Sequence, residues 1–241
     1  MGWRLGFLLA HRPELTYACE FNPPLPRKET LLDHPHRAPR RFDFRQRGLH
    51  RWRTGRRDAS AQPAAPPTRA TLLAIDGSVT SDLAEQLSRV PGDASHLVIS
   101  LGGNDALGSA DLLMAQVDST AETLMMFGSR LAPFEAAYTQ AIDAALALGR
   151  RTTLCTIYNG NLELPEAPLA RIALMMFNDV ILRTAIERQL PVIDLRFVCD
   201  QPEHYANPIE PSDSGGREIA KAILSACLAH EPLPHSQVFA G

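Results

Sequence analysis

The sequence predicts an α/β protein whose parallel sheet is covered by helices on both faces. From about residue 71 onward, short apolar runs alternate with segments that repeat apolar residues at helical spacing. The short runs are almost continuously apolar, which is typical of strands that are buried on both faces. Because strands and helices alternate along the chain, we expect three layers, with the sheet in the middle.

Four apolar runs predict the strands, and four periodic segments predict the helices. The expected strands cover 71–76, the run from 95 that enters the Gly-Gly turn before 105, 151–158 and 190–198. The expected helices cover 79–90, 130–148, 165–189 and 215–230. Gly77 ends the first run and Gly149 ends the second helix.

Composition excludes several classes of protein. The chain has 241 residues, 45% hydrophobic residues and a net charge of −3, which fits one substantial globular domain and excludes a disordered protein. No apolar run reaches the ~18 residues of a membrane-spanning helix, so we expect no membrane partner. The four cysteines lack CxxC spacing, which argues against a metal site or disulfide framework and predicts a cytoplasmic location.

The first 68 residues differ in character from the rest. Residues 36–57 contain nine arginines and a single acid, Asp43, and the segment up to about 70 has many prolines and no hydrophobic period. We therefore expect 1–68 to be disordered, 69–231 to form the folded domain and 232–241 to be a tail. A basic arm that binds nucleic acid is the alternative for 36–57, although the cluster has no recognisable domain context.

Three loops are candidates for a functional site, because ligands bind at the carboxyl ends of the strands in such sheets. The first is Asp76-Gly77-Ser78, the second runs from Gly102 to Asp105, and the third leads to Glu210-Pro211-Ser212.

These loops resemble conserved blocks of the SGNH (GDSL-type) hydrolases. LVISLGGNDAL resembles the third block, LLAIDGSVTSDLAEQL the second, and NPIEPSDSGGREIAKAI the fifth, in the family's order between residues 71 and 230. The resemblance implies a flavodoxin-like three-layer fold and hydrolysis of small-molecule esters or acylated substrates, with no cofactor and no metal. It also implies an oxyanion hole formed by the Asn104 side chain and the Gly77 N–H.

The fifth block departs from the family pattern. Aligned on Pro211, Glu210 occupies the position of the catalytic histidine, and Asn207 occupies that of the aspartate three residues earlier. A buried carboxylate is able to act as a general base. Glu210 is therefore a candidate base, with a solvated loop acid as the alternative. His204 is the nearby imidazole in the same loop, and a solvated surface histidine is its alternative interpretation.

The nucleophile block is the larger departure. The family places its serine in a Gly-Asp-Ser turn after the first strand, upstream of the second block, and this chain has no Gly-Asp-Ser there. We therefore expect the usual first strand to be missing. Ser78 lies in a strand-turn-helix context that suits a nucleophile. It also suits an N-cap for the helix that begins near Val79.

We hypothesise that a shift of reading frame before about residue 65 removed the missing block. One permitted set of codons for residues 36–57, read one base later, encodes Ile-Val-Leu-Leu-Gly-Asp-Ser-Ile-Phe-Asp-Asn-Ala-Ala-Tyr-Thr-Gly-Gly-Gly-Pro-Asp-Val-Val. This reads as an apolar strand, the Gly-Asp-Ser turn and a loop, and we expect the frame to be restored between Thr68 and Leu72. The sequence thus predicts an ester hydrolase with impaired or absent activity. A non-catalytic ligand-binding protein is the alternative.

Overall fold

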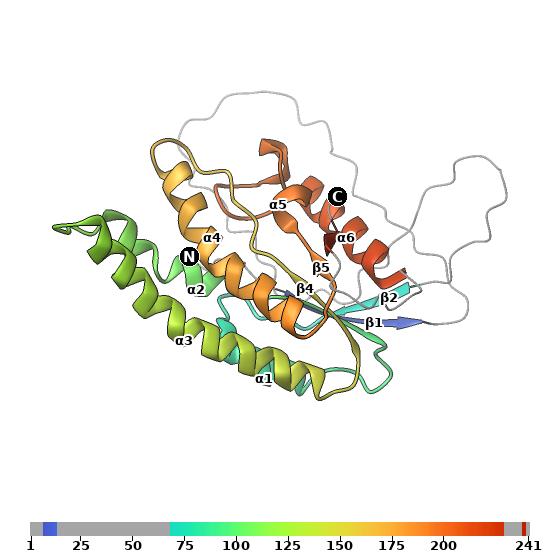
Figure 1. The fold of residues 1–241 in the computed structure, drawn as a ribbon. Helices are drawn as coiled ribbons and strands as arrows, with labels where there is room; N and C mark the ends of the chain where they lie inside the picture. The colour runs from blue at the N-terminus through green and yellow to red at the C-terminus, as the bar shows by residue number, and fades with distance from the viewer. Residues whose placement is uncertain (1–6, 14–67, 229–237, 240–241) are drawn as a thin grey trace, which may run out of the picture. The chain divides into compact units, whose positions relative to one another are not determined.

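A six-stranded sheet forms the centre of the protein. The computed structural model describes residues 7–13, 68–228 and 238–239 (Figure 1). The strands lie in the order β2-β1-β3-β4-β5-β6. Their bounds are Phe7–Pro13 for β1, Thr68–Leu72 for β2, His96–Ser100 for β3, Arg151–Cys155 for β4, Val192–Ile193 for β5 and Val238–Phe239 for β6.

Helices connect and cover these strands. The α-helices are α1 (Leu83–Leu87), α2 (Gly103–Leu107), α3 (Thr120–Leu146), α4 (Glu166–Glu187), α5 (Leu195–Val198) and α6 (Asp213–Leu228). Three short 3₁₀ helices precede α1, α3 and α6 at Thr80–Asp82, Ala110–Met114 and Pro202–His204.

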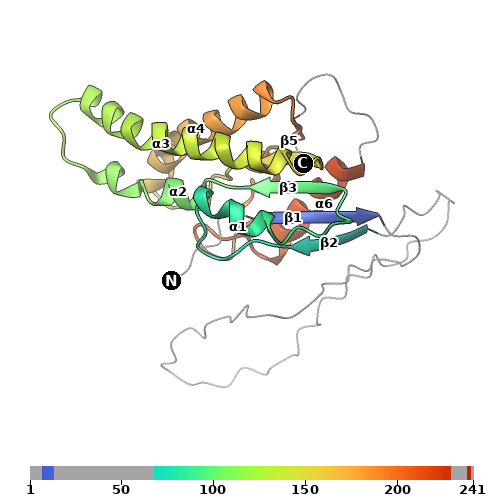
Figure 2. The ribbon, with the colours of Figure 1, turned by 90° about the horizontal axis from the view of Figure 1, so that it is seen from below.

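The predicted parallel sheet is confirmed from β3 to β6. β3 pairs with β4, β4 with β5 and β5 with β6, all in parallel. On its other side β3 pairs antiparallel with β1, with Phe7 opposite Ser100 (Figure 2). The neighbour of β3 on that side is therefore an antiparallel strand drawn from the segment 1–68. Apart from β1 and Thr68, that segment lies outside the described residues.

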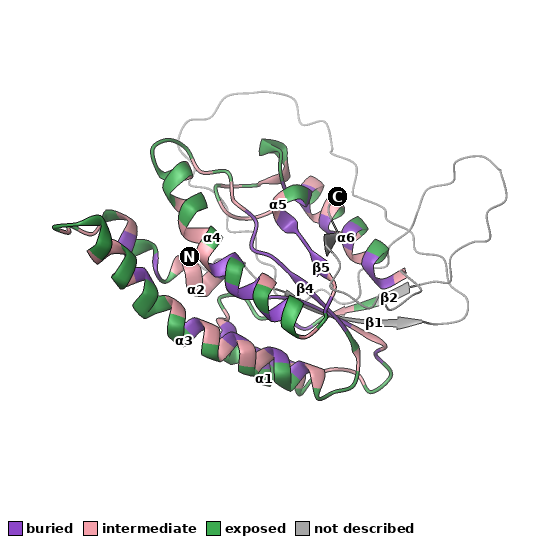
Figure 3. Cartoon of the chain, viewed as in Figure 1, coloured by how far each residue is buried: buried purple, intermediate pink, exposed green. Residues whose placement is uncertain are grey.

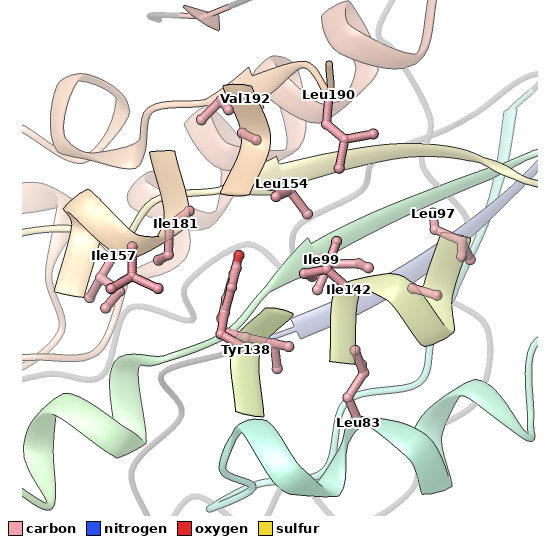
Figure 4. Close-up of a cluster of buried hydrophobic side chains, with 14 of the residues drawn as sticks. Leu83, Leu97, Ile99, Tyr138, Ile142, Leu154, Ile157, Ile181, Leu190 and Val192 are labelled. Carbon is pink, nitrogen blue, oxygen red and sulfur yellow. The ribbon is translucent and has the colours of Figure 1, made fainter. Parts of the chain in front are cut away.

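The two faces of the sheet are covered by different helices. Leu97, Ile99 and Leu154 pack in one cluster with buried side chains of α1, α3 and α4 (Figure 4). Val98 and Cys155, which alternate with them along the strands, pack in a second cluster with α5 and α6. The buried positions follow β3 to β5 through the centre of the domain (Figure 3). This is the predicted α/β/α sandwich.

Two predicted strands differ from the observed ones. The run 71–76 is not a buried strand, because β2 ends at Leu72 and the side chains of Leu72 and Ile75 are 66% and 40% exposed. The run 190–198 is a strand only at Val192–Ile193, because Asp194 accepts a hydrogen bond from the Arg196 N–H and caps α5.

Candidate active site at the carboxyl ends of the strands

The turn after β3 presents Asn104 in the first turn of α2. Gly102 caps this helix with φ 97°, a conformation that favours glycine. A Cβ atom at this position would lie 2.9 Å from Cζ of Phe134, so the space also requires glycine. Gly102 therefore lets the chain turn into α2 beside Phe134 of α3.

Asn104 joins this turn to the loop after β2. Its Nδ2 donates a hydrogen bond of 2.7 Å to the backbone carbonyl of Ser78. Gly77, the preceding residue, has φ 79° in a turn where the Ser78 N–H donates to the Ile75 carbonyl. An amide nitrogen carries two hydrogens, so one remains for another acceptor. Three of the predicted site residues thus lie together.

Asp105 makes a second link between the same two turns. Its Oδ2 accepts hydrogen bonds from the Thr80 backbone N–H at 3.0 Å and from the Thr80 hydroxyl at 2.9 Å. Thr80 is completely buried. Burial raises the pKa of Asp105 above its ordinary value, while the hydrogen bonds from Thr80 oppose this shift.

The third loop holds Glu210 against Asn207. Asn207 Oδ1 accepts hydrogen bonds from the backbone N–H groups of Ile209 and Glu210, at 3.0 and 2.9 Å. These bonds fix the amide so that its Nδ2 points to Glu210 Oε2, to which it donates at 2.7 Å. The residues in the positions of the family's aspartate and histidine are therefore paired directly, and Glu210 is half-buried.

The segment after β4 anchors this third loop. The Tyr158 hydroxyl donates to the Ile209 carbonyl at 2.9 Å, and the Asn161 N–H donates to the Pro208 carbonyl at 2.7 Å. Asn178 of α4 in turn holds Ile157 by accepting from its N–H and donating to its carbonyl. The Glu210 loop is thus fixed from the carboxyl end of β4, beside the strand that carries Asn104.

Two further predicted residues have local contacts. The N-cap position of the 3₁₀ helix is Val79, whose N–H donates to Asp82 Oδ2, so the predicted capping role of Ser78 is wrong. His204 Nδ1 accepts from the Gln201 N–H at 3.3 Å and lies 3.7 Å from Asp200 Oδ1. The His204 side chain is 14% exposed, so most of it is shielded from solvent.

The described part of the chain was searched for clusters of metal ligands and for membrane-spanning helices. Within residues 7–13, 68–228 and 238–239, no three His, Cys, Asp or Glu side chains gather as ligands of a metal ion would. The helices of the same residues are too short or too polar to cross a bilayer.

Thr80 and Asn178 were missed by the sequence interpretation. Thr80 lies 25 residues from its partner Asp105, and Asn178 lies 21 residues from Ile157. The signal that could have pointed to Asn178 is its place among apolar residues of the predicted helix, because a polar side chain that is buried there needs hydrogen-bond partners.

Comparison with solved structures finds several chains that are similar to this one. An extracellular lipase from Streptomyces rimosus is 18% identical, with a TM-score of 0.48 and coverage of 62% of this chain and 77% of the lipase. An acetyl xylan esterase is 18% identical, with a TM-score of 0.48 and coverage of 64% and 78%. A phospholipase A1 from Streptomyces albidoflavus NA297 is 17% identical, with a TM-score of 0.46 and coverage of 62% and 76%. No curated protein matches the sequence.

Most of the sequence also matches the profile of a protein family. The profile of the GDSL-like Lipase/Acylhydrolase family aligns with residues 39–217, which include the loops that carry Gly77, Asn104 and Glu210. Since this match spans well over half of the 241 residues, the chain belongs to the GDSL-like lipase/acylhydrolase family.

Proposed function

We propose that this protein hydrolyses small-molecule esters at the carboxyl ends of β3 and β4, with a turnover limited by the absence of the Gly-Asp-Ser block. The observation that carries the proposal is the hydrogen bond from Asn104 Nδ2 to the Ser78 carbonyl. It brings the amide of the third block next to Gly77 of the second block, the two groups that would stabilise an oxyanion.

The chemical role of this pair is to stabilise negative charge. Attack on an ester carbonyl places charge on the carbonyl oxygen in the transition state. The free hydrogen on Asn104 Nδ2 and the Gly77 N–H would both donate to that oxygen. Such donors are effective when they are already in place before the reaction, and Asn104 is held by its bond to Ser78.

Glu210 is the proposed general base. Its carboxylate would take the proton of the attacking hydroxyl as the new C–O bond forms. The same proton would pass to the leaving alcohol as the tetrahedral intermediate collapses. Asn207 keeps Glu210 Oε2 in one orientation and is itself fixed by two backbone bonds. A carboxylate is a weaker base than the imidazole that the family uses, which also limits the rate.

The attacking group is either Ser78 or water. Ser78 is half-buried and adjacent to Gly77, and its carbonyl is the acceptor for Asn104. Attack by Ser78 would give an acyl-enzyme that a water molecule then hydrolyses, whereas direct attack by water would release the acid without an acyl-enzyme.

Hydrolysis of p-nitrophenyl acetate tests the proposal. We expect slow turnover above the buffer rate, a loss of about a hundredfold or down to the buffer rate in Asn104→Ala, and a similar loss in Glu210→Gln. The exposed residues Asn161 and Glu203 provide the matched controls Asn161→Ala and Glu203→Gln. Turnover that is unaffected by Asn104→Ala would contradict the proposed oxyanion hole. Loss in Ser78→Ala would identify the nucleophile.

The missing nucleophile block favours a second candidate, a non-catalytic protein that binds an ester or a sugar ligand. A ligand that binds only the folded chain raises its melting temperature in a concentration-dependent way. Such stabilisation without any turnover would select this candidate.

We further propose a cytoplasmic location. The support is that Cys155, Cys199 and Cys227 are free and buried, as expected in a reducing compartment. The alternative of a nucleic-acid-binding arm concerns residues 36–57, which lie outside the described residues, and it stays a prediction.

A further inference from the structure

Hydrogen bonds to and from the side chains of Asn104 and Asp105 tie the loop after β2 to the start of α2. One runs from Asn104 to the Ser78 carbonyl, and two run from Thr80 to Asp105 Oδ2. Two consecutive residues of α2 thus hold both ends of the segment 78–80. Gly77, which carries the proposed oxyanion donor, directly precedes this segment.

We propose that Thr80 and Asp105 are positioning residues for the proposed oxyanion hole. Their hydrogen bonds hold the turn 77–80 in the position in which the Ser78 carbonyl accepts from Asn104. This inference rests on the proposed function, since it assigns a purpose to the contact between the turns. Neither residue is proposed to touch the substrate.

The burial of the two residues supports a fixed contact. Thr80 is fully buried, and the Thr80–Asp105 contact is partly shielded from water. A hydrogen bond to a charged acceptor in such surroundings is stronger than one at the surface. Gly77, at the start of the turn, is exposed, and a Cβ atom there would meet nothing within 4 Å.

The turn on the other side is closely packed. Gly102 packs against Phe134 and Ile157, and α2 follows directly. The loop carrying Gly77 is therefore the partner that needs to be positioned, and Asp105 lies on the closely packed partner. Without the bonds from Thr80 to Asp105, the hydrogen bond from Asn104 to the Ser78 carbonyl would still join the two turns.

The test is a comparison of amide signals in ¹⁵N-labelled full-length protein by NMR. The signals are the Gly77 backbone N–H and the Asn104 side-chain NH₂. We expect both to shift or broaden in Asp105→Ala, which removes both bonds, and to a smaller extent in Thr80→Val, which removes the hydroxyl bond. Thr80→Ser, which keeps the hydroxyl, should restore the wild-type positions.

Matched controls separate positioning from a general loss of structure. Thr152 is also a buried threonine whose hydroxyl donates a hydrogen bond, to the Arg150 carbonyl at the amino end of β4. Asp111 is an exposed acid paired with Arg130. Thr152→Val and Asp111→Ala should leave both signals in place.

The inference is overturned if a folded Thr80→Val has wild-type signals for Gly77 and Asn104, or if Thr152→Val moves them equally. Should Asp105→Ala fail to fold, the pair Thr80→Val and Thr80→Ser decides the question. The readout is independent of ester turnover. Shifted signals together with turnover insensitive to Asn104→Ala would therefore refute the proposed function and leave the positioning contact intact.

Discussion

The burial of Asp105 makes the stability of the folded chain depend on pH. The folded chain raises the pKa of its carboxyl group mainly through burial, and nearby Asp82 contributes in the same direction. A group with a raised carboxyl pKa binds its proton more tightly in the folded than in the unfolded chain. Its ionisation therefore opposes folding at neutral pH.

Replacing Asp105 by asparagine tests this consequence. Asp105→Asn keeps the shape of the side chain and removes its titration. As the pH rises from the unfolded value of 3.8 through the raised folded pKa, the wild type should lose free energy of unfolding relative to the variant. Above that window the difference should be constant. Urea unfolding at several pH values measures this difference in the free energy of unfolding. If the wild type instead gained stability relative to the variant over this pH range, the pKa of Asp105 would be lowered in the folded chain.

At the scale of residues, short motifs in the sequence pointed to candidate site residues, whereas contacts between distant residues could not be predicted. Asn104 and Gly77 were predicted from two short motifs, the Gly-Gly-Asn-Asp turn and the Asp-Gly-Ser turn. In the structure Asn104 donates a hydrogen bond to the carbonyl of Ser78, the residue after Gly77. The Thr80–Asp105 contact was not predicted, because no local pattern states which distant residue a buried carboxylate will meet.

At the scale of elements, α4 fixes the segment that supports Glu210. Asn178 is 1% exposed and makes two hydrogen bonds to the backbone of Ile157, at 2.7 and 2.9 Å. The next residue, Tyr158, holds the Ile209 carbonyl. A helix on one face of the sheet thus determines where the Glu210 loop lies.

We predict that Asn178→Ala lowers the free energy of unfolding by about 2–4 kcal/mol, because it leaves the N–H and carbonyl of Ile157 buried without partners. Exposed Asn161 in the same segment serves as the control, and Asn161→Ala should stay within about 0.5 kcal/mol of the wild type. Urea unfolding gives both values. Equal effects of the two substitutions would mean that the Ile157 bonds contribute little.

The helices were easier to predict than the strands. Their 3.6-residue period gave α4 and α6 to within two residues at either end. α3 begins at Thr120, ten residues before the predicted start, where Ser119 accepts a hydrogen bond from the Glu122 N–H. The runs 71–76 and 190–198 were misjudged, because an apolar run does not specify whether it is covered, and because the cap at Asp194 ends β5 early.

At the scale of the whole molecule, the site depends on the parallel part of the sheet. β3 and β4 point the same way, so the turns after them lie at one edge and carry Asn104 and the support of Glu210. On its other side β3 has the antiparallel strand β1. A parallel strand there would bring the turn that follows it to the same edge as Asn104.

The frame-shift hypothesis supplies that strand. The family match begins at residue 39 of the chain as it is translated and therefore includes part of the arginine-rich stretch. One permitted set of codons for residues 36–57, read one base later, would encode the apolar strand and Gly-Asp-Ser. We propose that 1–68 is out of frame, that 69–231 is the hydrolase domain and that 232–241 is a tail. The nucleotide sequence decides this directly, because a stop codon or the absence of Gly-Asp-Ser in the adjacent frame would refute it.

The central claim is that the proposed hydrolase site lacks the serine of the family's Gly-Asp-Ser block. The most direct test replaces residues 36–57 by the 22 residues of the adjacent frame and measures p-nitrophenyl acetate turnover beside the unaltered chain. We predict that the altered chain is at least about a hundredfold faster. That gain should be lost when the new serine is replaced by alanine, or when Asn104→Ala is added. An altered chain no faster than the original, or a gain that persists without Asn104, would contradict the claim.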